Sequence, residues 1–277
     1  MATATRRKKT TTRKRRTTPK TVEERIHPLS QSPKWWRGII YGHPGTGKST
    51  LAASSSEVGR TLMLNADRPD GLEAARSLGY TPEVIDVTNP EKDLDETIEY
   101  LRHGGHKEYD FFWVDSGTLY QEGLMEEVLA AVVAKSSYRD PDVPDKPEYL
   151  RTQVKLSKFI RRMRGIPINW GITAHVMSIV DEEDGEVLYM PYFQGGRGNL
   201  STKICGYVGV VGHLYVAQVK VKPKGGGKAR LVSRRTLQVQ PSNKYYAKDG
   251  FNVLGQEIIR PTMAQIMDVI NNGKEGE

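Results

Sequence analysis

The residue pattern with the clearest chemistry is a glycine-rich segment near the start of the chain. Residues 42–49 read Gly-His-Pro-Gly-Thr-Gly-Lys-Ser. This matches a phosphate-binding loop, because glycines let backbone N–H groups turn toward a phosphate and the following helix adds its N-terminal partial charge. Lys48 would reach the β- and γ-phosphates of a nucleotide, and the Ser49 hydroxyl would bind Mg²⁺. The alternative is a glycine-rich turn with a surface lysine. The expected nucleotide contacts are Gly42, His43, Pro44, Gly45, Thr46, Gly47, Lys48, Ser49 and Thr50.

A second candidate for this chemistry is an aspartate that follows an apolar segment. Asp115 comes directly after the run Tyr-Asp-Phe-Phe-Trp-Val at residues 109–114. In phosphate-loop proteins an aspartate at the end of such a strand holds the Mg²⁺ shell, so we predict a metal site formed by Ser49 and Asp115. The alternative is an ordinary turn aspartate. The next residue is Ser116 and not a glutamate, so the acid that orients water for hydrolysis is expected elsewhere.

The elements that must position these residues alternate along the first part of the chain. Short apolar runs predict strands, and segments with apolar residues on one face predict the helices between them. This alternation predicts an α/β fold with a mostly parallel sheet that helices cover on both faces. The expected strands are 37–41, 61–66, 83–87, 109–114 and 168–174, and the expected helices are 49–53, 70–78, 94–101, 119–135 and 148–164.

The character of the chain changes after about residue 175, where strands dominate. We expect strands at 176–180 and 187–192, followed by a flexible glycine-rich break at 195–199. A hairpin follows, with strands at 208–221 and 231–239 joined by a basic turn, and a short helix at 261–270 comes last. The C-terminal third is therefore predicted to be rich in β-hairpins.

Charge and composition divide the chain into a tail and a body. The net charge is +8, and the first 20 residues hold nine bases and no acid: Arg6, Arg7, Lys8, Lys9, Arg13, Lys14, Arg15, Arg16 and Lys20. Such a segment is too polar to fold alone and favours polyanions, most often nucleic acid. The alternatives are a solubilising tail, a nuclear-import-like signal or a ribosome-adhering artefact. We expect a disordered basic tail and linker at 1–33 and a single ATPase domain at 34–277.

The single cysteine and the hydropathy pattern bound the environment of the protein. Cys205 excludes an internal disulfide, which fits a reducing compartment, and we interpret it as a small buried apolar residue. No apolar run approaches the length of about 20 residues that a membrane span needs. We therefore expect a cytoplasmic protein with no membrane partner.

Two segments resemble the core of RecA-type recombinases. Residues 62–67 read Leu-Met-Leu-Asn-Ala-Asp and residues 74–79 read Ala-Ala-Arg-Ser-Leu-Gly, which is similar to the second core strand and next helix of that family. The family places its water-activating glutamate at the end of this strand, and Asp67 stands at the matching position. The resemblance implies that Asp67 activates water, and the alternative is a turn or helix-capping aspartate.

A further strand and loop resemble the same family. Residues 172–175 read Ile-Thr-Ala-His and resemble its γ-phosphate-sensing strand, so His175 would donate a hydrogen bond to a phosphate oxygen. The alternative is a histidine whose partners are backbone groups. The segment 194–199 with Lys203 resembles the mobile DNA-binding loop, where family members place a basic residue against a neighbour's ATP. Arg197 and Lys203 would take that role, unless the segment is only a mobile surface loop.

Over residues 34–262 the chain looks most similar to phage-encoded RecA-like P-loop ATPases of the single-strand annealing and recombination type. The resemblance implies a DNA-stimulated ATPase that uses ATP and Mg²⁺ and binds single-stranded DNA. It also implies a homo-oligomer, either a ring or a filament, in the cytoplasm of a phage host, with a single-strand-binding protein as a further partner. The expected DNA contacts are Lys222, Lys224 and Lys228 in the basic turn, together with the tail.

Three other functions remain open on sequence grounds. An AAA-type helicase loader or remodelling ATPase would use the same loop, although Ser116 and the β-rich C-terminal third argue against it. A small-molecule kinase would leave the basic tail and the basic turn without a purpose. A nucleotide-binding DNA-binding module without significant hydrolysis stays open because Asp67 replaces a glutamate.

Overall fold

The computed structural model describes residues 21–23, 26–136, 138–180, 185–221 and 228–273, apart from the side chains of Pro69 and Arg197. The chain separates into two compact units, Met1–Lys34 and Trp35–Glu277. In the first unit, the described residues include one short 3₁₀ helix, η2 (Leu29–Gln31). All elements discussed below belong to the second unit.

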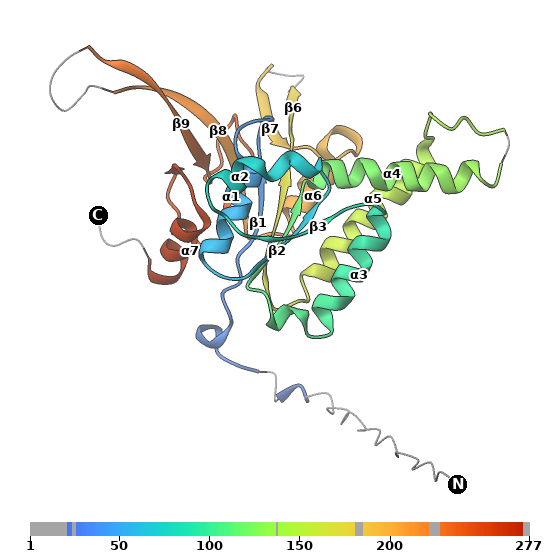
Figure 1. Ribbon diagram of the computed structural model, residues 1–277, viewed down its shortest axis with the longest axis horizontal. Coiled ribbons are helices and arrows are strands. Elements are labelled where there is room, and N and C mark those ends of the chain that lie inside the picture. The colour runs from blue at the N-terminus through green and yellow to red at the C-terminus, as the bar shows by residue number, and fades with distance from the viewer. Residues whose placement is uncertain (1–20, 24–25, 137, 181–184, 222–227, 274–277) are drawn as a thin grey trace, which may run out of the picture. The chain divides into compact units, whose positions relative to one another are not determined.

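One large sheet organises the second unit (Figure 1). Its strand order is β11-β9-β8-β1-β5-β4-β2-β3, and β10 pairs with β8. Strands β1, β2, β3, β4, β5 and β8 pair in parallel, whereas β9, β10 and β11 pair antiparallel to their neighbours. The predicted α/β fold with a mostly parallel sheet is therefore confirmed, and it is that of an α/β P-loop NTPase core.

Short apolar strands and amphipathic helices alternate in the parallel part of the sheet. The strands are β1 (Arg37–Tyr41), β2 (Thr61–Asn65), β3 (Glu83–Asp86), β4 (Phe111–Asp115) and β5 (Asn169–Ala174). The helices are α1 (Lys48–Ala53), α2 (Glu73–Ser77), α3 (Pro90–Arg102), α4 (Gly117–Val133) and α5 (Lys146–Met163). Short 3₁₀ turns lie between them: η3 (Ser54–Glu57), η4 (Pro69–Leu72) and η5 (Gly105–Lys107). Local signals set the helix starts: Asp145 and Glu148 form a capping box at α5, and Ser116 caps α4.

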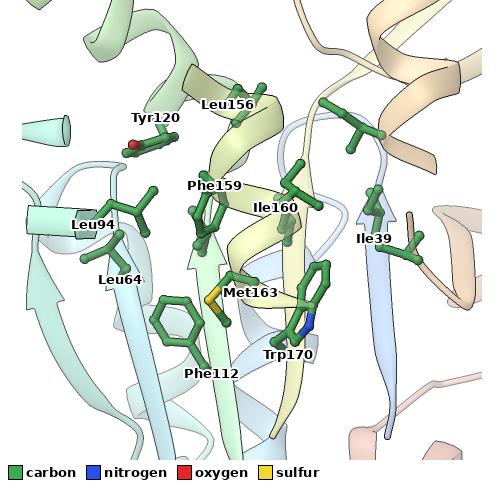
Figure 2. Packing of buried hydrophobic residues seen from close by; sticks show 14 of the residues in the cluster. Ile39, Leu64, Leu94, Phe112, Tyr120, Leu156, Phe159, Ile160, Met163 and Trp170 are labelled. Atoms are coloured by element: carbon green, nitrogen blue, oxygen red, sulfur yellow. The ribbon is translucent and has the colours of Figure 1, made fainter. Parts of the chain in front are cut away.

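Helices cover both faces of these strands, and each face has its own core. On one face, Leu64 of β2 and Phe112 of β4 pack with Leu94, Tyr120 and Phe159 of α3, α4 and α5 (Figure 2). The other face carries residues from α1, α2 and α7 (Met263–Asn272), packed against side chains such as Met63 and Trp113. Because adjacent residues of a strand point to opposite faces, a strand buried on both faces is expected to be mostly apolar.

The remaining strands lie after β5. They are β6 (Val176–Val180), β7 (Val187–Pro191), β8 (Val210–Val221), β9 (Arg230–Gln238), β10 (Lys248–Asp249) and β11 (Glu257–Ile259). Strands β6 and β7 form a separate antiparallel hairpin. Strands β8 and β9 continue beyond the sheet as a two-stranded ribbon (Figure 1), in which every residue is exposed or half-buried. The predicted hairpins are confirmed.

One prediction for this region is wrong. The segment 195–199 is not a flexible break, because residues Gly196–Gly198 form a 3₁₀ turn, η6, that leads directly into helix α6 (Asn199–Cys205). Leu200, Ile204 and Cys205 of α6 are buried in the core. Helix packing therefore outweighs the flexibility that the glycines suggest. The buried position of Cys205 agrees with its interpretation as an apolar residue, and burial raises the pKa of its thiol to about 12.

A helix that spans a membrane needs a certain length and apolar character. Across the part of the chain that the structure describes, no helix combines the length and the apolar character needed to span a bilayer.

Candidate nucleotide and metal site

The phosphate-binding loop lies between β1 and α1, the strand–loop–helix setting that gives the motif its meaning. Gly45 and Gly47 have φ angles of 76° and 96°, which side chains other than glycine rarely adopt. Gly42 leaves no room for a side chain either, since a Cβ there would lie 2.2 Å from the backbone oxygen of Leu214. The glycines of the pattern therefore meet a conformational and a steric requirement.

Lys48 is held inside this loop. It is 8% exposed, and its Nζ donates hydrogen bonds to the backbone oxygens of Gly42 and His43, at 3.0 Å each. Burial lowers the pKa of Lys48, and the negative charges of Asp115 and Asp67 oppose that shift. Two neutral carbonyl groups of the loop therefore hold the ammonium group of Lys48. A phosphate could take their place as its hydrogen-bond acceptor.

Asp115 lies at the end of β4, beside the loop. It is buried, and it accepts hydrogen bonds from the hydroxyls of Ser49 on α1 and Thr173 on β5. Burial raises the pKa of Asp115, whereas the two hydroxyls and the charge of Lys48 act in the opposite direction. The structure therefore brings the predicted Ser49–Asp115 pair into direct contact.

These donors suit Mg²⁺. A hydroxyl and one carboxylate are oxygen ligands, and Mg²⁺ is commonly bound through one or two carboxylates while water and substrate phosphates complete its shell. Among the described residues no group of three or more His, Cys, Asp or Glu side chains could hold a metal ion. These donors therefore fit a metal ion for which a nucleotide supplies some of the ligands better than one that protein groups hold alone.

Asp67 lies in the segment after β2, two residues beyond the end of the strand. Its side chain is exposed, and its carboxylate accepts a hydrogen bond of 2.8 Å from the backbone N–H of Arg68. The negative charge of Asp67 raises the pKa values of Lys48, Asp115 and His175. The structure therefore brings Asp67 close to the other candidates. Arg68 is the residue at the N-cap of η4, so Asp67 does not cap that turn.

His175 follows β5 and is half-buried. Its backbone is fixed on both sides, since its N–H donates to Thr118 Oγ1 at 3.0 Å and its carbonyl accepts from Tyr192 at 2.8 Å. Burial and the charge of Lys48 lower the pKa of His175, against the smaller effects of Glu122, Asp67 and Asp115. The imidazole is therefore neutral at neutral pH, and a neutral ring keeps one N–H donor for a phosphate oxygen.

Sequence reasoning missed two residues of this site. Thr173 donates to Asp115, and Glu122 of α4 acts on His175 through its charge. The sequence did contain a signal for Thr173, because it is a polar residue within the apolar run at the end of β5. No local pattern marks Glu122, which is one of several acids on α4.

A cavity of about 380 Å³ adjoins the phosphate loop. Gly47 and Thr50 form its edge toward the loop, Leu51 and Leu214 give it apolar walls, and Tyr80 adds an aromatic ring. A pocket with apolar walls and a few polar groups is typical of small-molecule sites. Its position next to the loop suits the base and ribose of a nucleotide.

Of the basic candidates for DNA or trans contacts, the structure describes the side chains of Lys203 and Lys228. Lys203 lies on α6 and lines a surface hollow with Leu150 and Val154 of α5, none of whose lining residues belongs to the loop. Lys228 is exposed, just before β9. Lys222, Lys224 and the side chain of Arg197 lie outside the described residues.

Comparison with known proteins adds one finding. The family model described as an AAA domain matches residues 34–251, which include the loop, Asp67, Asp115 and His175. No curated protein matches the chain.

Proposed function

The chain belongs to the AAA domain family of nucleotide-binding ATPases, and from that premise we propose that it is a RecA-like ATPase that acts on single-stranded DNA in recombination or annealing. The observation that carries the ATPase part is the assembly of Lys48, Ser49 and Asp115 at one edge of the sheet, with Ser49 and Asp115 hydrogen-bonded to each other. In phosphate-loop enzymes these residue types bind nucleotide phosphates and Mg²⁺.

The proposed roles follow from the surroundings of each side chain. The loop and Lys48 bind the phosphates, Ser49 and Asp115 hold Mg²⁺, and Mg²⁺ would neutralise charge on the phosphates. Asp67, exposed and close to Lys48, accepts the proton of the water that attacks the γ-phosphorus while the bond to the bridging oxygen of ADP breaks. His175 donates a hydrogen bond to the γ-phosphate and reports its loss.

The DNA part of the proposal rests on charge. The nine bases among the first 20 residues, Lys220 and Arg230 of the β8–β9 ribbon, and Lys228 just before β9 suit a polyanion, and the last three are exposed. Neutralising phosphates releases counterions, so this binding would weaken as salt rises. We extend the proposal to a homo-oligomer, a single-strand-binding protein as partner and a phage origin.

The family match itself favours a second candidate function, an AAA-type helicase loader or remodelling ATPase. The residue after Asp115 argues against this second candidate, because it is Ser116 and not a glutamate. Ser116 instead caps α4, where its hydroxyl oxygen accepts a hydrogen bond from Leu119 N–H at 3.3 Å. A loader would hydrolyse ATP in response to a protein partner and not to DNA alone.

The test is the steady-state ATPase rate of the full chain with and without single-stranded DNA, at stated salt. We expect DNA to stimulate wild type, Lys48→Ala to abolish the activity, and Lys92→Ala on the exposed face of α3 to change nothing. A rate that ignores DNA while Lys48→Ala still abolishes it would favour the loader. ATP binding without turnover would favour a non-hydrolysing module.

A further inference from the structure

The β8–β9 ribbon leaves the sheet at a defined point. Strand β1 pairs with β8 only through His213, and β11 pairs with β9 only from Thr236 onward. Beyond those residues, from Val216↔Arg235 to Val221↔Arg230, the described part of the chain adds no third strand to the pair. Arg235 therefore lies at the root of the ribbon.

From this root, the Arg235 side chain reaches the phosphate loop of its own chain. Its Nε donates to the backbone oxygen of Thr46 at 3.1 Å, across 189 residues of sequence. It also covers the α-carbon of Gly47, because a Cβ built there would lie 2.7 Å from Arg235 Nε. Its own backbone is fixed, since the Arg235 carbonyl accepts from Arg260 N–H at 2.8 Å.

Among the described residues, the guanidinium of Arg235 has no acidic partner. Its contact at the loop is a neutral carbonyl, and within the described residues no carboxylate forms an ion pair with it. Arg235 also lines the cavity beside the loop, together with Arg234 and Arg260, and none of the described lining residues is acidic. A cavity that combines apolar walls with three arginines suits a ligand with a flat apolar part and several negative charges.

We propose that Arg235 is a nucleotide-binding residue, which the ribbon supplies to the phosphate chain of a nucleotide bound in the loop of the same chain. This inference rests on the proposed nucleotide binding at Lys48. A guanidinium makes charge-assisted, often bidentate hydrogen bonds to phosphate, and it stays charged at all physiological pH values. The nucleotide site thus includes a residue from the antiparallel end of the sheet, far in sequence from the motif.

The experiment measures the affinity of the full chain for Mg²⁺-ADP by calorimetry. Arg235→Gln removes the charge and should weaken ADP binding at least about tenfold, because a charge-assisted contact is lost. Arg235→Lys keeps the charge and should stay within about threefold of wild type. The matched control, Arg102→Gln, removes an exposed arginine from α3 and should bind ADP as wild type does. Thermal melting without nucleotide checks that each variant is folded.

Two results would overturn the inference. Wild-type affinity in folded Arg235→Gln would show that Arg235 does not bind the nucleotide. An equal loss in Arg235→Lys and Arg235→Gln would show that the side chain acts only by holding Thr46. Lys48→Ala separates this inference from its premise: if that variant also binds ADP normally, the proposed function fails, whereas a loss in Lys48→Ala alone rejects only the role of Arg235.

Discussion

The parallel and antiparallel parts of the sheet differ in burial and in what they bring to the site. In the parallel part, all residues of β2 and β4 are buried, and polar side chains such as Asp115 and Thr173 appear where strands end. In the antiparallel part, exposed and half-buried residues alternate along the ribbon, and Lys220 and Arg230 are among its exposed bases. The parallel part therefore fixes the catalytic candidates, while the ribbon offers charge.

This difference explains why the site residues of the parallel part can be predicted from the sequence, whereas those of the ribbon cannot. Parallel strands place consecutive motif residues at one edge, so chemistry and position are both encoded locally. A ribbon contributes through contacts at long sequence distance, as Arg235 does with Thr46.

The largest effect is expected at the carboxylate of the parallel part. Asp115→Asn keeps the shape but removes the negative charge, so ATP turnover should fall on the order of 1,000-fold, and its dependence on Mg²⁺ should flatten. Turnover measured across a Mg²⁺ titration checks this. Asp268→Asn on the exposed face of α7 is the matched control and should leave the titration unchanged. A normal Mg²⁺ response in Asp115→Asn would remove Asp115 from the metal site.

A comparison of two acids tests which one activates water. Asp67→Asn should lower turnover about 100-fold while ADP affinity is kept, because general-base catalysis contributes on that order. Glu122→Gln should have little effect, since we expect the charge of Glu122 to influence only the pKa of His175, whereas that of Asp67 also raises the pKa values of Lys48 and Asp115. Single-turnover phosphate release measures both. The reverse order of effects would assign the base to Glu122.

Truncating a buried side chain of the parallel part should destabilise the fold more than truncating an exposed side chain of the ribbon. Leu64 on β2 is 0% exposed and Leu231 on the ribbon is 64% exposed. Leu64→Ala should reduce the free energy of unfolding by about 3 kcal/mol, and Leu231→Ala by less than about 0.5 kcal/mol. Urea unfolding measures both. Equal losses would mean that the ribbon is part of the core.

His213, where β8 joins β1, should make stability depend on pH. It is 4% exposed among Tyr41, Tyr189, Tyr215 and Tyr245, and burial, with the charges of His43 and Lys244, lowers its pKa to about 4. Below about pH 6.5, the pKa of histidine in the unfolded chain, His213 is protonated in the unfolded state. In the folded state it becomes protonated only near pH 4. This group therefore costs about 2 kcal/mol of stability between pH 7 and pH 5.

The variant His213→Phe provides the measurement. Its loss of stability between pH 7 and pH 5, followed by urea unfolding, should be smaller than that of wild type by about 2 kcal/mol. An identical pH dependence in both proteins would show that His213 is protonated as readily in the folded state as in the unfolded state.

Sequence alone predicted the parallel sheet, the phosphate loop and the Ser49–Asp115 pair because each depends on local spacing and strand ends. It missed α6, although Leu200 and Ile204 have helical spacing, because the preceding glycines suggested a loop. Arg235 could not be found, since it lies in a basic segment whose members look alike until the fold places one of them on the loop. Tertiary contact, and not residue type, distinguishes it.

We propose that the parallel part carries out hydrolysis and that the ribbon receives DNA. The most direct test is phosphate release by the full chain over a titration of single-stranded DNA, comparing wild type with the double variant Lys228→Ala/Arg230→Ala. We expect an unchanged rate without DNA, and a stimulation that needs more DNA or disappears. A double variant that DNA stimulates as it does wild type, or that has already lost its basal rate, would contradict this division.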